Sequence, residues 1–357
     1  MRKSLLLSAV LLSLVPLAAS AQGTGPYHIL KTAKVGGDGG FDYVYADADG
    51  RRLYIARGGA TGARMTVFNL DTLAPTGEIP GYSAHGAAVD PKSGHGFATS
   101  KPVVMWDTKT LAVIKTVPVD GSPDGILFDA FNQRVYSLSH SVPNLTAINA
   151  ADGSIAGTVD VGGAPEQTVT DGKGHLYVTL EDKNQIAVVD AKTLTVTAHY
   201  ELGDKGGTPA GLAFDVKNHI LFVACRNPAN MVIMDADTGK ILDAIPIGTG
   251  VDGATFNPQT MEAFSSQGDG TLSIIKENSP TSFALEQTVQ TMVGAKTLTL
   301  DRTTGHILLI AAEYGPPPPA PPPPPAGAAP PAGGRGGRGP GRGPMLPDSF
   351  SIIEVGR

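Results

Sequence analysis

A pattern of about 42 residues recurs seven times along the chain. Each copy starts with small or glycine-rich residues, continues with a short apolar segment that ends in a polar residue, and then has a second apolar segment. The polar residues that end the first segments are Asp47, Asp90, Asp129, Asp171, Asp215, Asn257 and Asp301. The intervals between them are 43, 39, 42, 44, 42 and 44 residues. A period of this length is typical of repeat folds, in which neighbouring copies pack on one another.

Each copy also contains a third and a fourth apolar segment. The third ends in a short polar residue, as at Asp107, Asp190 and Asp235, and a turn leads into the fourth, as at residues 241–247. Four short strands within roughly 40 to 50 residues are typical of a propeller blade. A high content of Gly (45) and Pro (29) fits such a turn-rich β protein. We therefore predict an all-β fold: a seven-bladed β-propeller with four antiparallel strands per blade, forming a single domain over residues 22–357.

The last copy has a third apolar segment at residues 350–355 but no fourth one. Near the N-terminus, residues 28–35 form an apolar segment that belongs to none of the seven copies. If the two segments paired, the last blade would be complete and no long strand edge would stay open. We therefore predict that the N-terminal strand closes the last blade.

Residues 1–21 have the pattern of a secretory signal peptide. Two basic residues precede an apolar run at residues 5–18, and the small-residue sequence A-S-A that follows ends at Ala21. The run is shorter than the roughly 20 residues that span a bilayer, so an uncleaved membrane anchor is the weaker alternative. We expect cleavage after Ala21 and a periplasmic or secreted protein that is monomeric and has no membrane span.

Short motifs within the repeats resemble those of a known family. The sequence YVTL occurs at residues 177–180, with weaker versions at 54–57 and 222–225, and PDG occurs at the start of the third copy, at 123–125. In these motifs the chain resembles the YVTN family of seven-bladed propellers, which includes the YncE-like periplasmic proteins. The resemblance covers the mature chain apart from a Pro/Gly-rich insertion. It implies a binding scaffold, and single-stranded DNA binding is known within the YncE-like group.

One position in each copy is expected to face the central channel at the end of the propeller where the innermost strands begin. These positions, five residues before each repeat Asp or Asn, are Asp42, His85, Asp124, Glu166, Ala210, Asp252 and Lys296. All except the alanine are candidate ligand-binding residues, because crowded carboxylates raise one another's pKa values or attract a divalent cation. The alternative is that the aspartates only bond their own backbone in turns. Loops between second and third strands are expected to add Arg57, Lys101, His140, Glu181, Arg226 and Glu313 to the same face.

The sequence contains no H-E-x-x-H, G-x-S-x-G or phosphate-loop motif. Its single cysteine, Cys225, excludes an intramolecular disulfide, and the net charge of −6 argues against a protein that coats nucleic acid. Histidine pairs at the short spacing typical of a copper or zinc centre are also absent. We therefore predict a non-enzymatic scaffold that binds a small ligand, a cell-envelope protein or single-stranded nucleic acid, with no cofactor apart from the divalent cation that the acidic residues could attract. The alternative is a propeller hydrolase of lactonase type, in which His85, Glu166 and Arg226 would be catalytic.

The last copy carries an insertion at residues 315–347. Proline runs at 316–319 and 321–325 precede an Arg/Gly run. The proline half is expected to be stiff polyproline II, and the insertion as a whole disordered, because it has few apolar side chains to bury. Its arginines, Arg335, Arg338 and Arg342, are candidate contacts for single-stranded nucleic acid or a partner. The alternative is a tolerated loop without a specific use.

Overall fold

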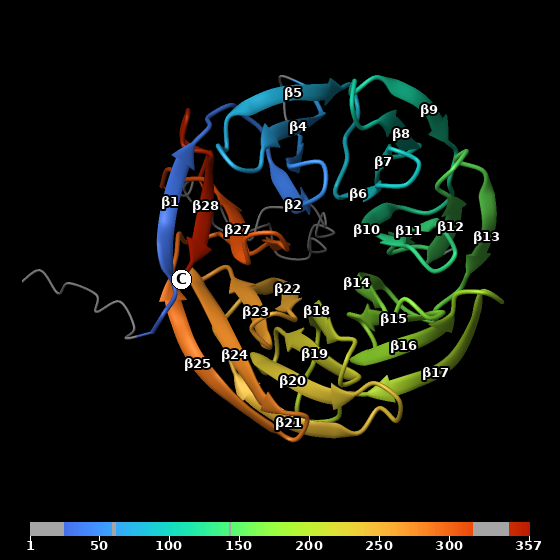
Figure 1. Cartoon of the computed structure of the whole chain (residues 1–357), viewed down its shortest axis with the longest axis vertical. Helices are drawn as coiled ribbons and strands as arrows, with labels where there is room; N and C mark the ends of the chain where they lie inside the picture. Colours follow the sequence, from blue (N-terminus) through green and yellow to red (C-terminus); the bar gives the residue numbers. More distant parts are fainter. Residues whose placement is uncertain (1–24, 59–61, 143, 317–342) are drawn as a thin grey trace, which may run out of the picture.

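The computed structural model describes residues 25–58, 62–142, 144–316 and 343–357. Within this part of the chain, 28 strands form seven four-stranded antiparallel sheets that are arranged as blades around a central axis (Figure 1). The predicted seven-bladed propeller is therefore confirmed. No helix long and apolar enough to cross a membrane is found among the described residues. The predicted signal peptide and Arg335, Arg338 and Arg342 lie outside the described residues.

Each blade contributes one strand to each of four concentric positions. The inner strands are β2 (Phe41–Asp47), β6 (Ala87–Asp90), β10 (Pro123–Asp129), β14 (Pro165–Thr170), β18 (Pro209–Asp215), β22 (Val251–Asn257) and β26 (Leu298–Asp301). The second strands are β3 (Arg52–Arg57), β7 (His95–Ala98), β11 (Arg134–Ser139), β15 (His175–Leu180), β19 (Ile220–Cys225), β23 (Glu262–Gln267) and β27 (His306–Ala311). The third strands are β4 (Arg64–Asn69), β8 (Val103–Asp107), β12 (Leu145–Asn149), β16 (Gln185–Asp190), β20 (Asn230–Asp235), β24 (Thr271–Ser279) and β28 (Ser351–Gly356). The outer strands are β5 (Pro75–Pro80), β9 (Val113–Val117), β13 (Ile155–Val159), β17 (Thr195–Glu201), β21 (Ile241–Pro246), β25 (Ser282–Gln290) and β1 (His28–Lys34).

The hydrophobic core lies between neighbouring blades. Every residue of the inner strand β18 is buried, whereas the outer strand β17 alternates between exposed and half-buried side chains. The aromatic residues that recur in the second strands pack across the blade boundaries. Tyr54 lies 5.5 Å from Trp106, and Phe222 lies 5.4 Å from Phe256, measured between ring centroids. A blade cannot bury both of its faces alone, so this packing explains why the repeats form a closed ring.

The N-terminal strand completes the last blade, as predicted. β1 pairs antiparallel with β28, from His28 opposite Gly356 to Lys34 opposite Ser351. The residues that flank this pair are tied to the neighbouring blade. The Tyr27 hydroxyl and the Arg357 guanidinium both contact the carboxylate of Glu262, which is fully buried. The two ends of the described chain are therefore fixed to the same point of the ring.

The repeat Asp residues lie where the inner strands end, at what we call the lower face. Their carboxylates accept hydrogen bonds from backbone N–H groups of the turns that follow, for example from Gly50 to Asp47 at 2.9 Å and from Thr303 to Asp301 at 3.0 Å. These residues thus shape the turns between the first and second strands. The described flanks of the predicted insertion lie at the opposite, upper face, where Tyr314 and Met345 form an antiparallel bridge.

Candidate functional site

Backbone irregularities position the channel-facing residues at the upper face. In β2, β10, β14, β18 and β22 the pairing register shifts within the first residues of the strand, where Asp42, Asp124, Glu166, Ala210 and Asp252 lie. A bulge at the start of a strand re-aims the side chain that it carries. The inner strands β6 and β26 begin later, so His85 and Lys296 lie in the segments just before them.

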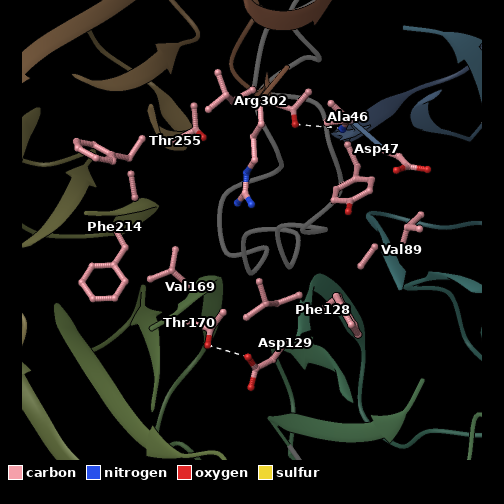
Figure 2. A pocket seen from close by; sticks show the side chains of 18 of the residues that line it. Ala46, Asp47, Val89, Phe128, Asp129, Val169, Thr170, Phe214, Thr255 and Arg302 are labelled. Carbon is pink, nitrogen blue, oxygen red and sulfur yellow. Dashed lines mark hydrogen bonds between the residues drawn. The ribbon is translucent and has the colours of Figure 1, made fainter. Parts of the chain in front are cut away.

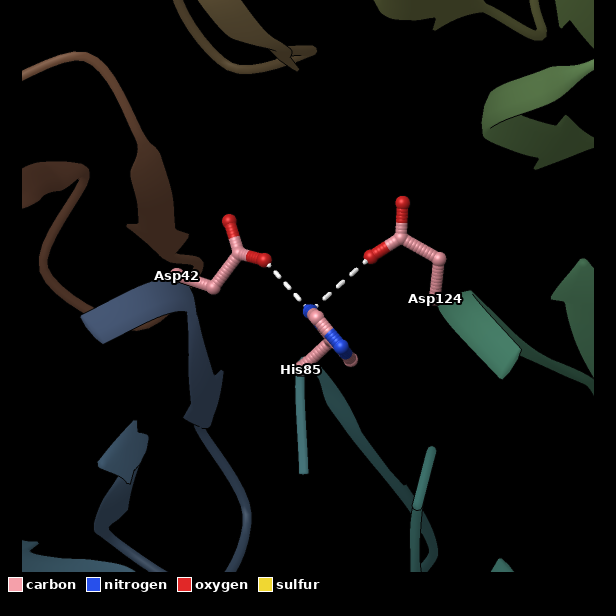
Figure 3. Close-up of side chains that lie close together, drawn as sticks. All are labelled: Asp42, His85 and Asp124. Carbon is pink, nitrogen blue, oxygen red and sulfur yellow. Dashed lines mark hydrogen bonds and ion pairs between the residues drawn. The ribbon is translucent and has the colours of Figure 1, made fainter. Parts of the chain in front are cut away.

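His85 lies between two carboxylates from the neighbouring blades (Figure 3). Its Nδ1 atom is 2.7 Å from Oδ2 of Asp42 and 3.2 Å from Oδ1 of Asp124. The His85 side chain is 47% exposed, whereas that of Asp124 is 12% exposed. The imidazole is therefore open to a ligand from solvent, while the carboxylate of Asp124 is held in the wall of the channel.

A second histidine continues this set of contacts. Nε2 of His140, in the loop after β11, is 3.2 Å from Oδ2 of Asp124 and 3.1 Å from Oε2 of Glu166. The Tyr43 hydroxyl donates a hydrogen bond of 3.0 Å to Oε1 of Glu166. Asp42, His85, Asp124, His140 and Glu166 thus form a continuous line of contacts, which we call the imidazole–carboxylate chain.

The other half of the upper face is an ion-paired network. Arg226 contacts the carboxylates of both Glu181 and Asp252, and Lys296 also contacts Asp252. Burial alone would lower the pKa of Arg226, but the carboxylates of Asp252 and Glu181 raise it above its usual value. Two fixed cations thus face two carboxylates, and this half of the site is balanced in charge.

The imidazole–carboxylate chain holds its protons tightly. Burial raises the pKa of Asp124 to about 7, and the nearby carboxylates of Glu166 and Asp42 contribute to the rise. The hydrogen bond to Glu166 raises the pKa of His140 to about 8. The hydrogen bond to Asp42 raises the pKa of His85 in the same way. At neutral pH a cation that binds here would therefore displace a proton from His140.

Two overlapping groups of donor atoms have the spacing that a metal ion needs. One consists of Asp42, His85 and Asp124, and the other of Asp124, His140 and Glu166, and within each group one donor atom per residue lies within 4.8 Å of the others. Asp124 belongs to both groups and directs one carboxylate oxygen at each histidine. Imidazole nitrogen with carboxylate oxygen suits zinc, copper, nickel or iron better than it suits magnesium or calcium.

The structure brings most of the predicted residues together, in two separate sets. Asp42, His85, Asp124 and Glu166 belong to the imidazole–carboxylate chain, and Asp252 and Lys296 belong to the ion-paired network. Their carboxylates contact side chains from other segments rather than their own turns. No hydrogen bond or ion pair joins the alternative catalytic residues His85, Glu166 and Arg226 to one another within the described chain.

Two contributions to the site were missed or placed only roughly. Tyr43 does not belong to any motif that recurs in the seven copies. Its contact with Glu166 joins the first blade to the fourth. His140 was expected at the upper face, but nothing in its spacing indicated a contact with Asp124. Arg57, also expected there, is buried instead: it donates a hydrogen bond of 2.8 Å to the Asp38 carbonyl, and its guanidinium lies 3.7 Å from the centre of the Phe350 ring.

Comparison with known proteins adds only the fold. No protein-family model and no curated protein sequence matches the chain. Among solved structures, a chain of the structure described as "Crystal Structure of Mitotic Checkpoint Complex" superposes with a TM-score of 0.66 and 12% sequence identity, covering 86% of this chain and 95% of that one. At this identity the likeness shows a shared propeller fold, which hosts many functions.

Proposed function

We propose that the chain is an exported, non-enzymatic β-propeller scaffold that binds a divalent transition-metal ion at its upper face. The observation that carries the proposal is the position of Asp124, whose two oxygens approach His85 and His140, with a further carboxylate at the same ring nitrogen of each histidine. The proposal that the protein is exported rests on residues 1–21, which have the sequence pattern of a signal peptide.

Charge favours a cation over an anion at this position. The imidazole–carboxylate chain contains three carboxylates and no Lys or Arg. The nearby cations Arg226 and Lys296 are already paired with Glu181 and Asp252. An anionic ligand would find no fixed cation to pair with in this cluster, whereas a divalent cation that displaces its protons would be neutralised by the three carboxylates.

Metal analysis of the mature protein, purified without chelator, tests the proposal. We expect a bound transition metal, or saturable zinc binding by the metal-free protein in calorimetry. Asp124→Asn should weaken zinc binding at least tenfold, because it removes an oxygen ligand shared by both donor groups. Asp252→Asn makes the same chemical change in the ion-paired network and should leave zinc binding within about twofold. If wild-type protein binds no zinc, or if both variants bind it as the wild type does, the metal proposal is wrong.

The alternative of a lactonase-type hydrolase requires more than the described contacts provide. His85 supplies a base whose ring is oriented by Asp42. Arg226, the third residue of this set, is paired with two carboxylates instead. Hydrolysis of any member of a lactone panel that is abolished by His85→Gln would favour this alternative over the scaffold.

Nucleic-acid binding through Arg335, Arg338 and Arg342 is a separate proposal that rests on sequence composition. Deletion of residues 317–342 should abolish binding of a single-stranded oligonucleotide if these arginines carry it. Unchanged oligonucleotide affinity in the deletion variant would show that the insertion is not the binding segment.

A further inference from the structure

We propose a second ligand site, at the lower face of the propeller, for a small organic monoanion with an apolar body. The inner strands enclose a cavity of about 760 Å³ on the propeller axis (Figure 2). This volume is within the range of roughly 300 to 1,000 Å³ that small-molecule sites have. The lining includes the turn residues Asp49, Pro91, Ala130 and Val216, so the cavity opens at the lower face, away from the imidazole–carboxylate chain.

Two side chains cross the channel between this cavity and the upper site. Tyr43 of β2 donates a hydrogen bond of 3.2 Å to the Glu166 carbonyl of β14, on the far side of the ring. The Gln167 side chain accepts hydrogen bonds from Leu212 N (2.8 Å) and Ala254 N (3.3 Å), which joins the fourth blade to the fifth and sixth. The lower cavity is therefore a compartment of its own, and a ligand there need not disturb the upper site.

Polar and apolar side chains share the wall of the cavity, which faces solvent at one end. Val89, Phe128, Val169 and Phe214 come from four successive blades and surround the cavity in Figure 2. Each of these side chains lies one position before the last residue of its inner strand. Apolar side chains of this kind bind the hydrocarbon part of a ligand by removing it from water.

The guanidinium of Arg302 is the group that would select a ligand with a negative charge. Arg302, in the turn after β26, projects its guanidinium toward the centre of the cavity (Figure 2). That guanidinium makes no hydrogen bond or ion pair with any of residues 25–58, 62–142, 144–316 and 343–357. A guanidinium that has no such partner within the described chain, beside apolar side chains, fits a carboxylate or sulfonate attached to a hydrocarbon body, because the two oxygens match its paired donors.

Three carboxylates at the opening of the cavity limit how much negative charge a ligand can carry. Asp47 accepts from Gly50 N, and Asp129 accepts from Phe131 N and from the Thr170 hydroxyl, so both are engaged in turns. Burial raises the pKa of both groups. Asp49 lies exposed at the rim. These carboxylates would repel a polyanion such as a nucleic acid. A monoanion has a single negative charge, which can pair with Arg302.

Calorimetric titration of the mature protein with naphthoate tests the proposal, with naphthalenemethanol as the uncharged probe of the same shape. We expect one saturable site for naphthoate and at least tenfold weaker binding of the alcohol. Arg302→Gln should reduce naphthoate affinity about tenfold without changing the affinity for the alcohol. Lys92→Gln removes a cation from another lower-face turn, outside the cavity lining, and should have no effect.

A cavity-filling variant tests the location. Thr255→Trp places an indole in the cavity from the sixth blade and should abolish binding of both probes. Asp124→Asn, at the upper face, should leave naphthoate binding unchanged, which separates this site from the proposed metal site. The proposal is overturned if naphthoate shows no saturable binding up to about 1 mM. It is equally overturned if naphthoate binding survives both Arg302→Gln and Thr255→Trp.

Discussion

Asp124 connects the two histidines of the upper face, since each of its carboxylate oxygens faces a different imidazole. The same ring nitrogen of each histidine also contacts a second carboxylate: Asp42 for His85 and Glu166 for His140. A carboxylate beside an imidazole stabilises the charged imidazolium, so each of these contacts tends to keep a proton on the ring. The protonation of the cluster is thus set by a few pairwise contacts.

The effect of the neighbouring carboxylates on the histidine pKa values can be tested without any metal. The pKa of His140 is about 8, above the usual 6.5, and the contact with Glu166 is the largest cause. Glu166→Gln removes the negative charge and should lower the His140 pKa below 8, because the imidazolium loses one of its two carboxylate partners while Asp124 remains and burial still disfavours the charged ring. NMR titration of the histidine ring protons measures both values. Glu201→Gln, on the exposed strand β17, is the control. A His140 pKa that stays near 8 in Glu166→Gln would contradict the assigned cause.

At the scale of the strand, the glycine of the P-D-G sequence is needed where two blades approach closely. A Cβ atom on Gly125 would lie 2.6 Å from the Glu166 carbonyl oxygen and 2.8 Å from a Leu138 methyl group. This glycine therefore lets β10 and β14 bring Asp124 and Glu166 to the same histidine. The motif that suggested the family resemblance thus has a local steric role.

Gly125→Ala should cost about 1 to 3 kcal/mol of unfolding free energy, because backbone atoms must move to admit the methyl group. It should also weaken any metal binding at the upper face, since Glu166 is displaced. Gly253→Ala is the matched control: its Cβ would meet its nearest neighbour, a Leu298 methyl group, at an ordinary 3.4 Å. Chemical denaturation of the two variants measures the difference. Equal stability of both would show that the contact at Gly125 relaxes without cost.

For the whole molecule, the network at the ring closure makes stability depend on pH. Glu286 of β25 lies beside the buried carboxylate of Glu262 and within 3.9 Å of Arg357. The hydrogen bond that protonated Glu286 donates to Glu262 raises the pKa of Glu286 to about 6. The folded state therefore holds this proton more tightly than the unfolded chain does. The resulting stabilisation is complete below the unfolded-state pKa of about 4.5 and is lost as the pH rises through 6.

Glu286→Gln supplies an uncharged amide donor at every pH. We expect it to be more stable than the wild type at pH 8 by up to about 1 kcal/mol, a value reduced by solvent screening of this partly exposed group. At pH 4.5 the two proteins should have the same stability. Thermal melts at both pH values measure the effect. A variant that is equally stable or less stable at pH 8 would contradict the role assigned to Glu286.

The sequence allowed the fold to be predicted more fully than the site. Seven repeats and one missing strand determine the propeller and its closure, because turn residues such as Asp47 and interblade aromatics such as Tyr54 recur at fixed spacing. The site depends on contacts across the channel, which have no period. The Tyr43–Glu166 contact joins the first and fourth blades, and Arg57 is drawn inward by loop carbonyls and the Phe350 ring.

The pairing of β1 with β28 also orders the events of folding. His28 lies near the start of the described chain, and its partner Gly356 lies near its end. Six blades can form from strands that are close together in the sequence, but the seventh is complete only after two segments far apart in the sequence have met. Such non-local pairing is formed slowly. Until then the edge of β28 that β1 covers stays unpaired, so the interval before closure is the period in which the chain is most exposed to aggregation and proteolysis.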